Sequence, residues 1–239
     1  MQQHIHELCR TLRLGNFISE NYQNIEAESH EEFLVKLLRE TVEERERKRK
    51  NRYLQQAHFD LLKDFSDFDF SHLTLPSFLS PDDLLKGDFV KKKQNLILYG
   101  KPGTGKTHLA IALGVEACKR GQKVLFYKTS RLVNHLLEAK QEGKLQKFWK
   151  TLMGTDLLIL DEWGYIPFER SGTQLLFEVV SDCYEKRSVI LTTNLSFDEW
   201  NTIFYDEKLT AAMLDRLVHH GLLIIHDGPS YRLTHSSMQ

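Results

Sequence analysis

The octapeptide GKPGTGKT, from Gly100 to Thr107, constrains the fold of this chain more than any other stretch. It follows the apolar run NLILY (95–99) and precedes the helical pattern HLAIALGVEACKRG. Its glycines allow the backbone to turn so that several N–H groups point inward around phosphate oxygens, and the start of the next helix adds a partial positive charge. A strand, a glycine-rich loop and a helix in this order predict a phosphate-binding loop in a parallel α/β domain.

Four further apolar runs resemble the run before this loop. Each is short and nearly continuous, which is typical of strands buried on both faces of a parallel sheet. The runs are KVLFY (123–127), DLLIL (156–160), SVILT (188–192) and LLII (222–225). Helical patterns separate them along the chain. The alternation predicts an α/β P-loop NTPase core with a parallel five-stranded sheet.

The N-terminal part has a different character, with no proline and only Gly15 as glycine in residues 1–75. Leu34, Leu38 and Val42 recur every four residues and predict an amphipathic helix, and LQQAHFDLL predicts another short helical stretch. We therefore expect a small helical N-terminal domain over residues 1–65 and the P-loop domain over residues 66–239. The segment FSDFDFSHLTLP is expected to form an extended linker into the second domain.

The phosphate-binding loop supplies the expected nucleotide ligands. They are Gly100, Pro102, Gly103, Thr104, Gly105, Lys106, Thr107 and His108. In such a loop Lys106 reaches the β- and γ-phosphates of a nucleotide, and Thr107 gives its hydroxyl to Mg²⁺. The alternative is an ordinary glycine-rich loop, but the flanking strand and helix favour the phosphate site.

Asp161 and Glu162 directly follow the run DLLIL, at the carboxyl end of a predicted strand. Ligands of doubly wound sheets bind beyond these ends. Asp161 can hold Mg²⁺ there through its water shell, and Glu162 can polarise an attacking water as a general base. Two acids after a strand can also form a solvated turn. Their combination with the P-loop favours an ATPase that activates water.

Two further polar residues are candidates for the same site. Asn194 ends SVILTTN, where it can position the attacking water or only cap the end of a strand. Arg216 lies in AAMLDRLVHHGLL, on the polar face of a short helix that we expect to stop at Gly221. The helical pattern alone does not decide whether Arg216 faces solvent or a partner.

Composition excludes several classes of protein. The net charge of −1 gives no global basic field, so any nucleic-acid surface must be a local patch. Cys9, Cys118 and Cys183 lie far apart, without a CxxC pair or a Cys/His cluster at metal-ligand spacing, so no zinc site is expected. Scattered thiols, a start without signal-peptide layout and the lack of a long apolar run indicate a cytoplasmic protein that does not enter a membrane.

Six motifs occur in an order that resembles one family. They are GKPGTGKTHLAIALG, LLILDEWGY, SVILTTN, FDEW, AAMLDRLVHH and SYRL. The chain resembles, over nearly its whole length, the AAA+ ATPases of the IstB type. These are helper ATPases of bacterial insertion sequences and are similar to the DnaC helicase loaders.

The resemblance implies roles for individual residues. Lys106 and Thr107 match the P-loop pair, and Asp161 and Glu162 match the acid pair. Asn194 matches the sensor asparagine. Arg216 matches the arginine finger that completes the site of a neighbouring subunit, so the chain is expected to self-associate into a ring or a helix.

Basic side chains form two candidate surfaces for duplex DNA. The first contains Arg45, Arg47, Lys48, Arg49, Lys50 and Arg52, and the second contains Arg131, Lys140, Lys144, Lys147 and Lys150. The first can instead be a solvated helix face with pairs such as Glu44–Lys48 and Glu46–Lys50. The role of the second follows from the resemblance, since related ATPases carry an extra helix there. Contacts to phosphates predict binding with little sequence specificity.

The chain departs from the family at two points. Family members often carry arginine where this chain has Cys183, which leaves Arg187 to take any such role. The sequence ends at Gln239, soon after Arg216, which leaves too little chain for the C-terminal helical lid of most AAA+ proteins. The sensor arginine of that lid is therefore missing unless Arg232 replaces it.

The expected function is an ATP- and Mg²⁺-dependent ATPase that assembles on duplex DNA and assists the transposase of the same element. A DnaC-like loader of a replicative helicase is the alternative within the same fold. A stand-alone P-loop enzyme such as a small-molecule kinase is a third possibility, against which Glu162, Asn194 and Arg216 argue.

Overall fold

The structure is a computed structural model that describes residues 1–165, 167–204 and 206–234. The chain divides into two compact units, Met1–Arg52 and Tyr53–Gln239. This division differs from the boundary expected after residue 65, because residues 53–65 pack with the second unit.

The N-terminal unit is helical, as expected. It contains α1 (Gln2–Thr11), α2 (Phe17–Asn21), the short 3-10 helix η1 (Tyr22–Asn24) and most of α3 (His30–Gln56). Its small core consists of Cys9, Ile18 and Leu37. The helix predicted around Leu34 is confirmed, but Leu34, Leu38 and Val42 are exposed and the neighbouring row with Leu37 is buried.

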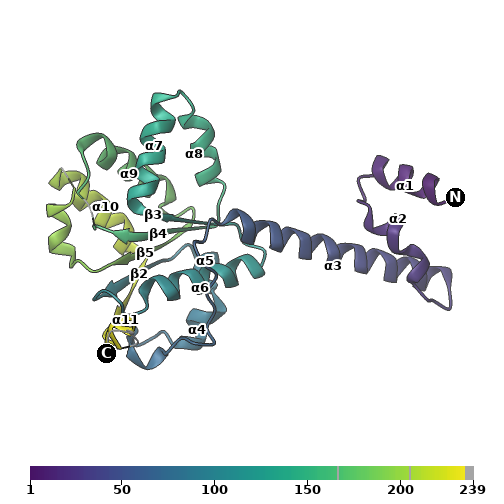
Figure 1. The fold of residues 1–239 in the computed structure, drawn as a ribbon, viewed down its shortest axis with the longest axis horizontal. Helices are drawn as coiled ribbons and strands as arrows, with labels where there is room; N and C mark the ends of the chain where they lie inside the picture. The colour runs from purple at the N-terminus through teal and green to yellow at the C-terminus, as the bar shows by residue number, and fades with distance from the viewer. Residues whose placement is uncertain (166, 205, 235–239) are drawn as a thin grey trace. The chain divides into compact units, whose positions relative to one another are not determined.

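The second unit is built on one six-stranded sheet (Figure 1). The strands are β1 (Leu73–Thr74), β2 (Asn95–Gly100), β3 (Val124–Lys128), β4 (Leu157–Trp163), β5 (Ser188–Thr193) and β6 (Gly221–His226). Their order across the sheet is β1-β6-β2-β5-β4-β3. The five predicted parallel strands are confirmed, and β1 adds a short antiparallel strand against β6.

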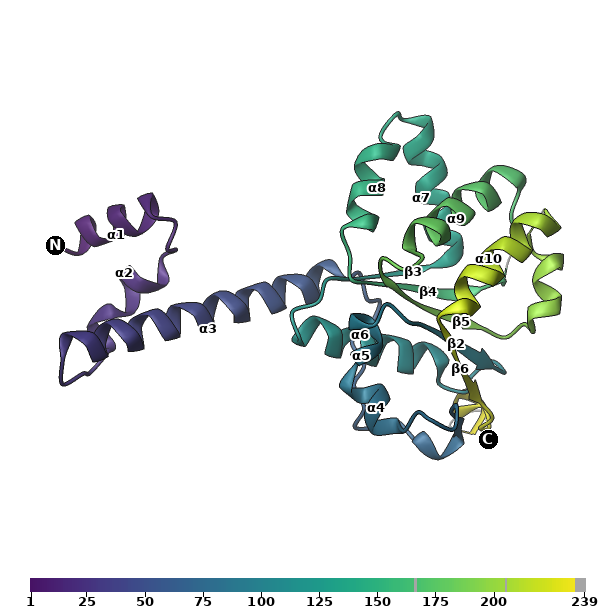
Figure 2. The same ribbon diagram turned by 180° about the vertical axis from the view of Figure 1, so that it is seen from behind.

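Helices cover both faces of this sheet (Figures 1 and 2). One face carries α7 (Thr129–Gln141), α8 (Leu145–Met153), α9 (Arg170–Cys183) and α10 (Glu207–His219). The other carries α4 (Pro81–Lys86), α5 (Asp88–Lys91) and α6 (Lys106–Lys119). Apolar side chains of the central strands alternate between the two resulting cores, so that Leu158 and Leu160 enter the first core while Leu157 and Ile159 enter the second.

The segment before β2 corrects two expectations. The helix α3 ends at Gln56, so the helical pattern does not continue through LQQAHFDLL. The expected linker is packed instead: Phe65, Phe68 and Phe70 lie against the core around α6, and a 3-10 turn, η2 (Phe70–His72), leads into β1. Burial of three phenylalanines explains why this segment joins the domain and does not stay extended.

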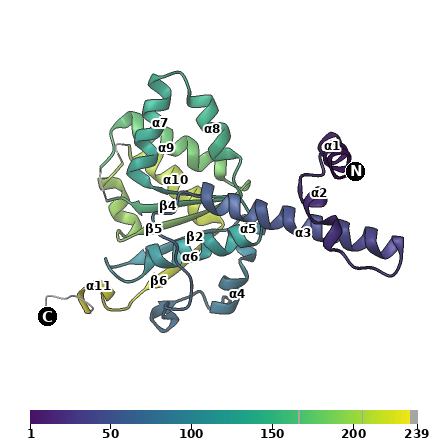
Figure 3. The same cartoon turned by 45° about the vertical axis from the view of Figure 1, so that its right-hand side comes forward.

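Two short elements follow the last two strands of the sheet along the chain. The 3-10 helix η3 (Phe197–Thr202) follows β5, and α11 (Tyr231–Thr234) follows β6 (Figure 3). Within the described residues, no helix is both long and apolar enough to cross a membrane.

Candidate functional site

The P-loop connects β2 to α6. Gly103 has φ +84° and Gly105 has φ +91°, a left-handed conformation that glycine adopts without strain. A side chain at Gly103 would also collide with Ser230. The Tyr231 N–H donates a hydrogen bond of 3.0 Å to the Gly103 carbonyl, so the segment after β6 lies directly against the loop.

Lys106 begins α6 and is almost fully buried, with 6% of its surface exposed. Its ammonium donates to the carbonyl of Gly100 at 2.6 Å and to that of Lys101 at 2.7 Å. Burial lowers the pKa of Lys106 to about 8, with a smaller contribution from the positive charge of Arg232. The Lys106 ammonium therefore lies at the start of α6, against two backbone carbonyls of its own loop.

Asp161, at the carboxyl end of β4, is 2% exposed. Its Oδ1 accepts hydrogen bonds from the Thr107 hydroxyl at 2.8 Å and from the Thr192 hydroxyl at 2.5 Å. Burial raises the pKa of Asp161, against the lowering effect of the two threonines. A hydroxyl and a carboxylate oxygen side by side form a hard donor set that fits Mg²⁺.

Glu162 sits on an irregularity in the sheet. The register between β4 and β5 shifts between Leu160 and Trp163, and Glu162 has φ +58°. Such a bulge turns a side chain away from the regular alternation of the strand. The Glu162 carboxylate forms an ion pair of 2.8 Å with Lys128, and its backbone N–H donates to the Thr192 hydroxyl at 3.0 Å.

A cavity of about 360 Å³ joins these groups, within the size range of small-molecule sites. Its lining includes Pro102, Gly103, Gly105, Lys106, Thr107, His108 and Glu162, all of them predicted. It also includes Lys63, Ile111, Tyr165, Thr192, Tyr231 and Arg232. Gly100 and Thr104 contribute through backbone carbonyls that bind Lys106 and His226. Arg232, which the sequence raised as a replacement sensor, thus lines the site.

Sequence reasoning missed several of these residues for identifiable reasons. Thr192 and Lys128 are ordinary residues at strand ends, and only the sheet order shows that β3 and β5 flank β4. Lys63 lies just before FSDFDF, a segment that we expected to be part of an extended linker. The phenylalanines of FSDFDF were the available signal, because three aromatic side chains in six residues seldom remain solvated.

His226 is a further residue that the sequence analysis missed. It ends β6 opposite Gly100, is 2% exposed and contacts the Thr104 carbonyl through Nδ1 at 3.0 Å. Burial lowers its pKa to about 4, so its imidazole is neutral at pH 7 and can donate from Nδ1. His226 therefore fixes the middle of the P-loop to the edge of the sheet.

Asn194 follows β5 but is not among the described residues that line the cavity. Its Oδ1 is buried without a hydrogen-bond partner among the described residues. A buried amide oxygen of this kind is costly unless something bonds to it. The role of Asn194 as a sensor stays a prediction.

Arg216 is half-buried on α10 and is absent from the described lining of its own chain's cavity. Its guanidinium donates to the Ala212 carbonyl at 2.8 Å and lies 5.2 Å from the centre of the Phe177 ring. The helical pattern left open whether Arg216 faces solvent or a partner, and in the structure its side chain contacts residues of α9 and α10. His219 and His220 follow Arg216 at the C-terminal end of α10.

The basic residues predicted to contact DNA are mostly exposed, and several of them form ion pairs with acidic side chains. In the N-terminal unit, Arg47 and Lys48 both pair with Glu44, at 2.7 and 3.3 Å, and Arg45 donates to the Arg13 carbonyl. Arg49 is exposed on the same helix.

In the second unit, Arg131 pairs with Asp60 at 3.7 Å and Lys144 with Glu142 at 2.7 Å. Lys140 is exposed at the end of α7. The extra helical segment predicted after the second parallel strand is confirmed as the pair α7 and α8.

Cys183, where family members often have arginine, is buried in the core, and burial raises its pKa to about 12. Arg187 points its guanidinium to the Met153 sulfur.

The parallel sheet order, the P-loop and the acid pair at the end of β4 define a P-loop nucleotide-binding protein with an AAA+ core. The structure is similar to that of DnaI (TM-score 0.57, 20% identity, covering 71% of this chain and 90% of that chain). It is also similar to the DnaC helicase loader (TM-score 0.50, 23% identity, 73% and 98%) and to AMPPCP-bound DnaA from Aquifex aeolicus (TM-score 0.52, 23% identity, 64% and 47%). At these identities the likeness shows the fold.

Residues 12–239 match the IstB-like ATP binding protein family, and the chain belongs to this family. It is 36% identical to an insertion-sequence ATP-binding protein of Geobacillus stearothermophilus, over 100% of this chain and 97% of the relative. It is 40% identical to an insertion-sequence ATP-binding protein of Pseudomonas aeruginosa, over 86% of this chain and 77% of the relative. Both findings confirm the resemblance drawn from the motifs.

Proposed function

We propose that this protein hydrolyses ATP in the cavity between the P-loop and β4, and that hydrolysis serves DNA transposition. The observation that carries the proposal is that two elements meet at one cavity: Lys106 and Thr107 of α6 and Glu162 of β4 line it, and Asp161 of β4 is hydrogen-bonded to Thr107. A small-molecule kinase needs no water-activating acid, whereas Glu162 is held beside the cavity by an ion pair and a strand irregularity.

The residues of the site have separate roles in phosphoryl transfer. Backbone N–H groups of the loop and the Lys106 ammonium bind the β- and γ-phosphates. Thr107 and Asp161 hold Mg²⁺, which when bound neutralises phosphate charge. Glu162 accepts a proton from the attacking water as general base, and Lys128 orients its carboxylate in the resting site.

Arg216 completes the site of a neighbouring subunit in this proposal. Its absence from the cavity lining of its own chain supports such a role, as does its position on a helix at the surface of the domain. A guanidinium beside the γ-phosphate stabilises transition-state charge and contributes ~10³-fold or more in rate. Hydrolysis then depends on assembly into a ring or a helix.

Duplex DNA and the transposase of the same element are the proposed partners. Two relatives that match most of this chain are ATP-binding proteins of insertion sequences, which supports a role in transposition over a DnaC-like helicase loader. Exposed basic side chains on α3 and around α7 supply phosphate contacts, so binding is largely independent of sequence and weakens with salt. In this proposal, ATP binding promotes the assembly of neighbouring subunits on the duplex.

The test is the rate of ATP hydrolysis as a function of protein concentration, with and without duplex DNA. We expect turnover per chain to rise with concentration and with DNA. Glu162→Gln is expected to abolish turnover and keep ATP binding. Arg216→Ala is expected to abolish turnover, whereas Arg10→Ala, which removes an exposed arginine of α1, is the control and should leave turnover unchanged.

Two outcomes would replace the proposal. A rate strictly proportional to protein concentration, unaffected by DNA and by Arg216→Ala, would identify a stand-alone P-loop enzyme. Stable capture of the replicative helicase, without ATP-dependent binding of duplex DNA, would identify a helicase loader.

A further inference from the structure

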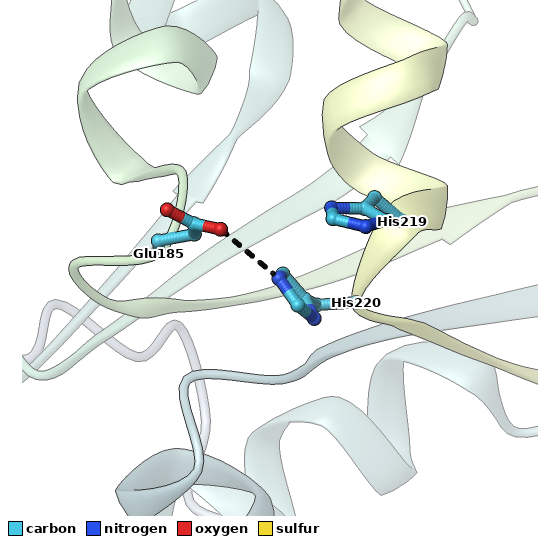
Figure 4. Close-up of side chains that lie close together, drawn as sticks. All are labelled: Glu185, His219 and His220. Carbon is cyan, nitrogen blue, oxygen red and sulfur yellow. Dashed lines mark hydrogen bonds and ion pairs between the residues drawn. The ribbon is translucent and has the colours of Figure 1, made fainter.

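Three side chains with metal-ligand chemistry meet where α10 ends, beside the turn between α9 and β5 (Figure 4). Glu185 lies in this turn, and His219 and His220 close the helix. One ligand atom from each of them lies within 4.8 Å of the others. We propose that these three residues bind a divalent transition-metal ion that favours imidazole ligands, such as Zn²⁺.

The distances suit such an ion after small side-chain movements. Zinc–ligand bonds of about 2.0–2.1 Å place tetrahedral ligand atoms about 3.4 Å apart. His220 Nε2 already lies 3.3 Å from a Glu185 carboxylate oxygen. Glu185 and His219 are exposed, so rotation about their side-chain bonds meets little resistance from packing. Three protein ligands leave one position for water.

The backbone around the cluster is fixed before any ion binds. The turn is held by hydrogen bonds of 3.0 Å from the N–H groups of Lys186 and Arg187 to the Cys183 carbonyl. Glu185 has φ +57° within it, which sets the direction of its side chain. The histidines follow the carbonyl end of α10, where the helix dipole favours a cation.

Tyr184 supplies the outer partner that ligating histidines commonly have. Its hydroxyl lies 2.6 Å from Nδ1 of His219, and the two rings stack. When Nδ1 of His219 is protonated, it donates a hydrogen bond to the Tyr184 oxygen. Nε2 of His219 is then unprotonated, and its lone pair is available to the ion. No zinc site was predicted from the sequence because it has no CxxC pair or Cys/His cluster at metal-ligand spacing, whereas here no cysteine takes part and Glu185 and His220 are 35 residues apart.

The ion has a structural consequence for the proposed ATPase. It joins the turn after α9 to the end of α10, and these are the two helices that hold Phe177 and Arg216 together. This consequence rests on the proposed function, but binding of the ion does not. The two are separated by measuring metal binding and unfolding apart from hydrolysis.

The test is titration of the full chain with Co²⁺, followed by displacement with Zn²⁺. We expect one equivalent of Co²⁺ with visible absorption bands of nitrogen ligation, loss of the bands with Zn²⁺, and a higher Tm in Zn²⁺. His219→Ala, His220→Ala and Glu185→Gln should each weaken Zn²⁺ binding by more than about tenfold, and Tyr184→Phe by about tenfold.

Two controls keep the result specific. His30→Ala removes an exposed histidine from the other unit, and Asp161→Asn removes the carboxylate of the nucleotide site, so both should leave the bands unchanged. Circular dichroism checks that the variants fold, and Glu185→Gln changes only an exposed carboxylate. Wild-type protein without nitrogen-ligated Co²⁺, or His219→Ala/His220→Ala protein that binds Zn²⁺ as tightly as wild type, would overturn the proposal.

Discussion

At the scale of single residues, the candidate site holds its key side chains in unfavourable surroundings. Asp161 is a carboxylate taken almost fully out of water, and Lys106 is an ammonium that bonds to the carbonyls of its own loop. Glu162 adopts a backbone conformation that suits glycine better. Perturbed charges and backbone strain concentrate at functional sites, where the surrounding structure must hold them in place.

Asp161→Asn should stabilise the protein while it abolishes ATP hydrolysis. Burial raises the pKa of Asp161, which means that the fold disfavours its charge, and asparagine keeps an oxygen to accept from Thr107 and Thr192. The expected gain in the free energy of unfolding is about 1 kcal/mol. Thermal unfolding of both proteins without nucleotide measures it, and a lower Tm for the variant would contradict the argument.

Glu162→Gly should give a more stable protein than Glu162→Ala. Both variants remove the ion pair with Lys128, but only glycine relieves the strain at φ +58°. The expected difference is about 1 kcal/mol in the free energy of unfolding. Urea denaturation measures it. The same pair of substitutions at Glu142, which has φ −81°, is the matched control and should favour alanine.

Nucleotide binding near pH 8 should be accompanied by proton uptake at Lys106. Its pKa is lowered to about 8 by burial, so about half of the chains lack this proton at that pH. Contact with phosphates raises the pKa again, and the missing protons are taken from the buffer. Calorimetry in two buffers of different ionisation enthalpy measures the uptake. Lys106→Arg keeps its charge throughout and should bind with less uptake; equal uptake would place the titrating group elsewhere.

At the scale of elements, the P-loop depends on the strand beside it. His226 at the end of β6 contacts the Thr104 carbonyl, and the backbone after β6 binds Gly103. The pair β2 and β6 therefore acts as a frame that sets the loop before any phosphate arrives. A loop whose backbone is already held in position needs little rearrangement when a charged ligand binds to its N–H groups.

The same contact predicts a loss of stability in mild acid. The folded-state pKa of His226 is about 4, below the ordinary value of 6.5, so between these values the unfolded chain binds more protons. The free energy of unfolding should fall by about 1–3 kcal/mol as pH drops from about 6.5 toward 4. Asp161, whose pKa is raised, acts in the opposite sense in acid, so the comparison is with His226→Gln. Urea unfolding across this range should give a flatter pH profile for the variant.

Strands and loops could be predicted from the sequence where a single local pattern of residues determines them. The five parallel strands are continuous apolar runs, and the P-loop is a fixed spacing between a strand and a helix. The segment from Ala57 to Leu75 was not predictable in this way, because its phenylalanines pack against α6 and only the tertiary fold shows that surface. Lys128 and Thr192 reach the site for a similar reason, since the sheet order is not written in any short stretch.

At the scale of the whole molecule, Arg216 is not among the described residues that line the proposed nucleotide cavity of its own chain. Mixing two inactive variants tests whether a second copy does. Arg216→Ala subunits keep an intact cavity, and Lys106→Ala subunits keep the arginine, so their mixture should regain part of the ATPase activity. A mixture as inactive as either variant alone, with assembly confirmed by light scattering, would contradict action between subunits.

The hydrogen bond between Tyr231 and Gly103 has a practical consequence for anyone who handles this protein. Tyr231 and Arg232 belong to the wall of the nucleotide cavity, so a fluorophore, an affinity tag or a fusion partner placed directly after Thr234 would be attached within a few residues of the phosphate site. A dye after Thr234 would therefore serve as a reporter of nucleotide binding.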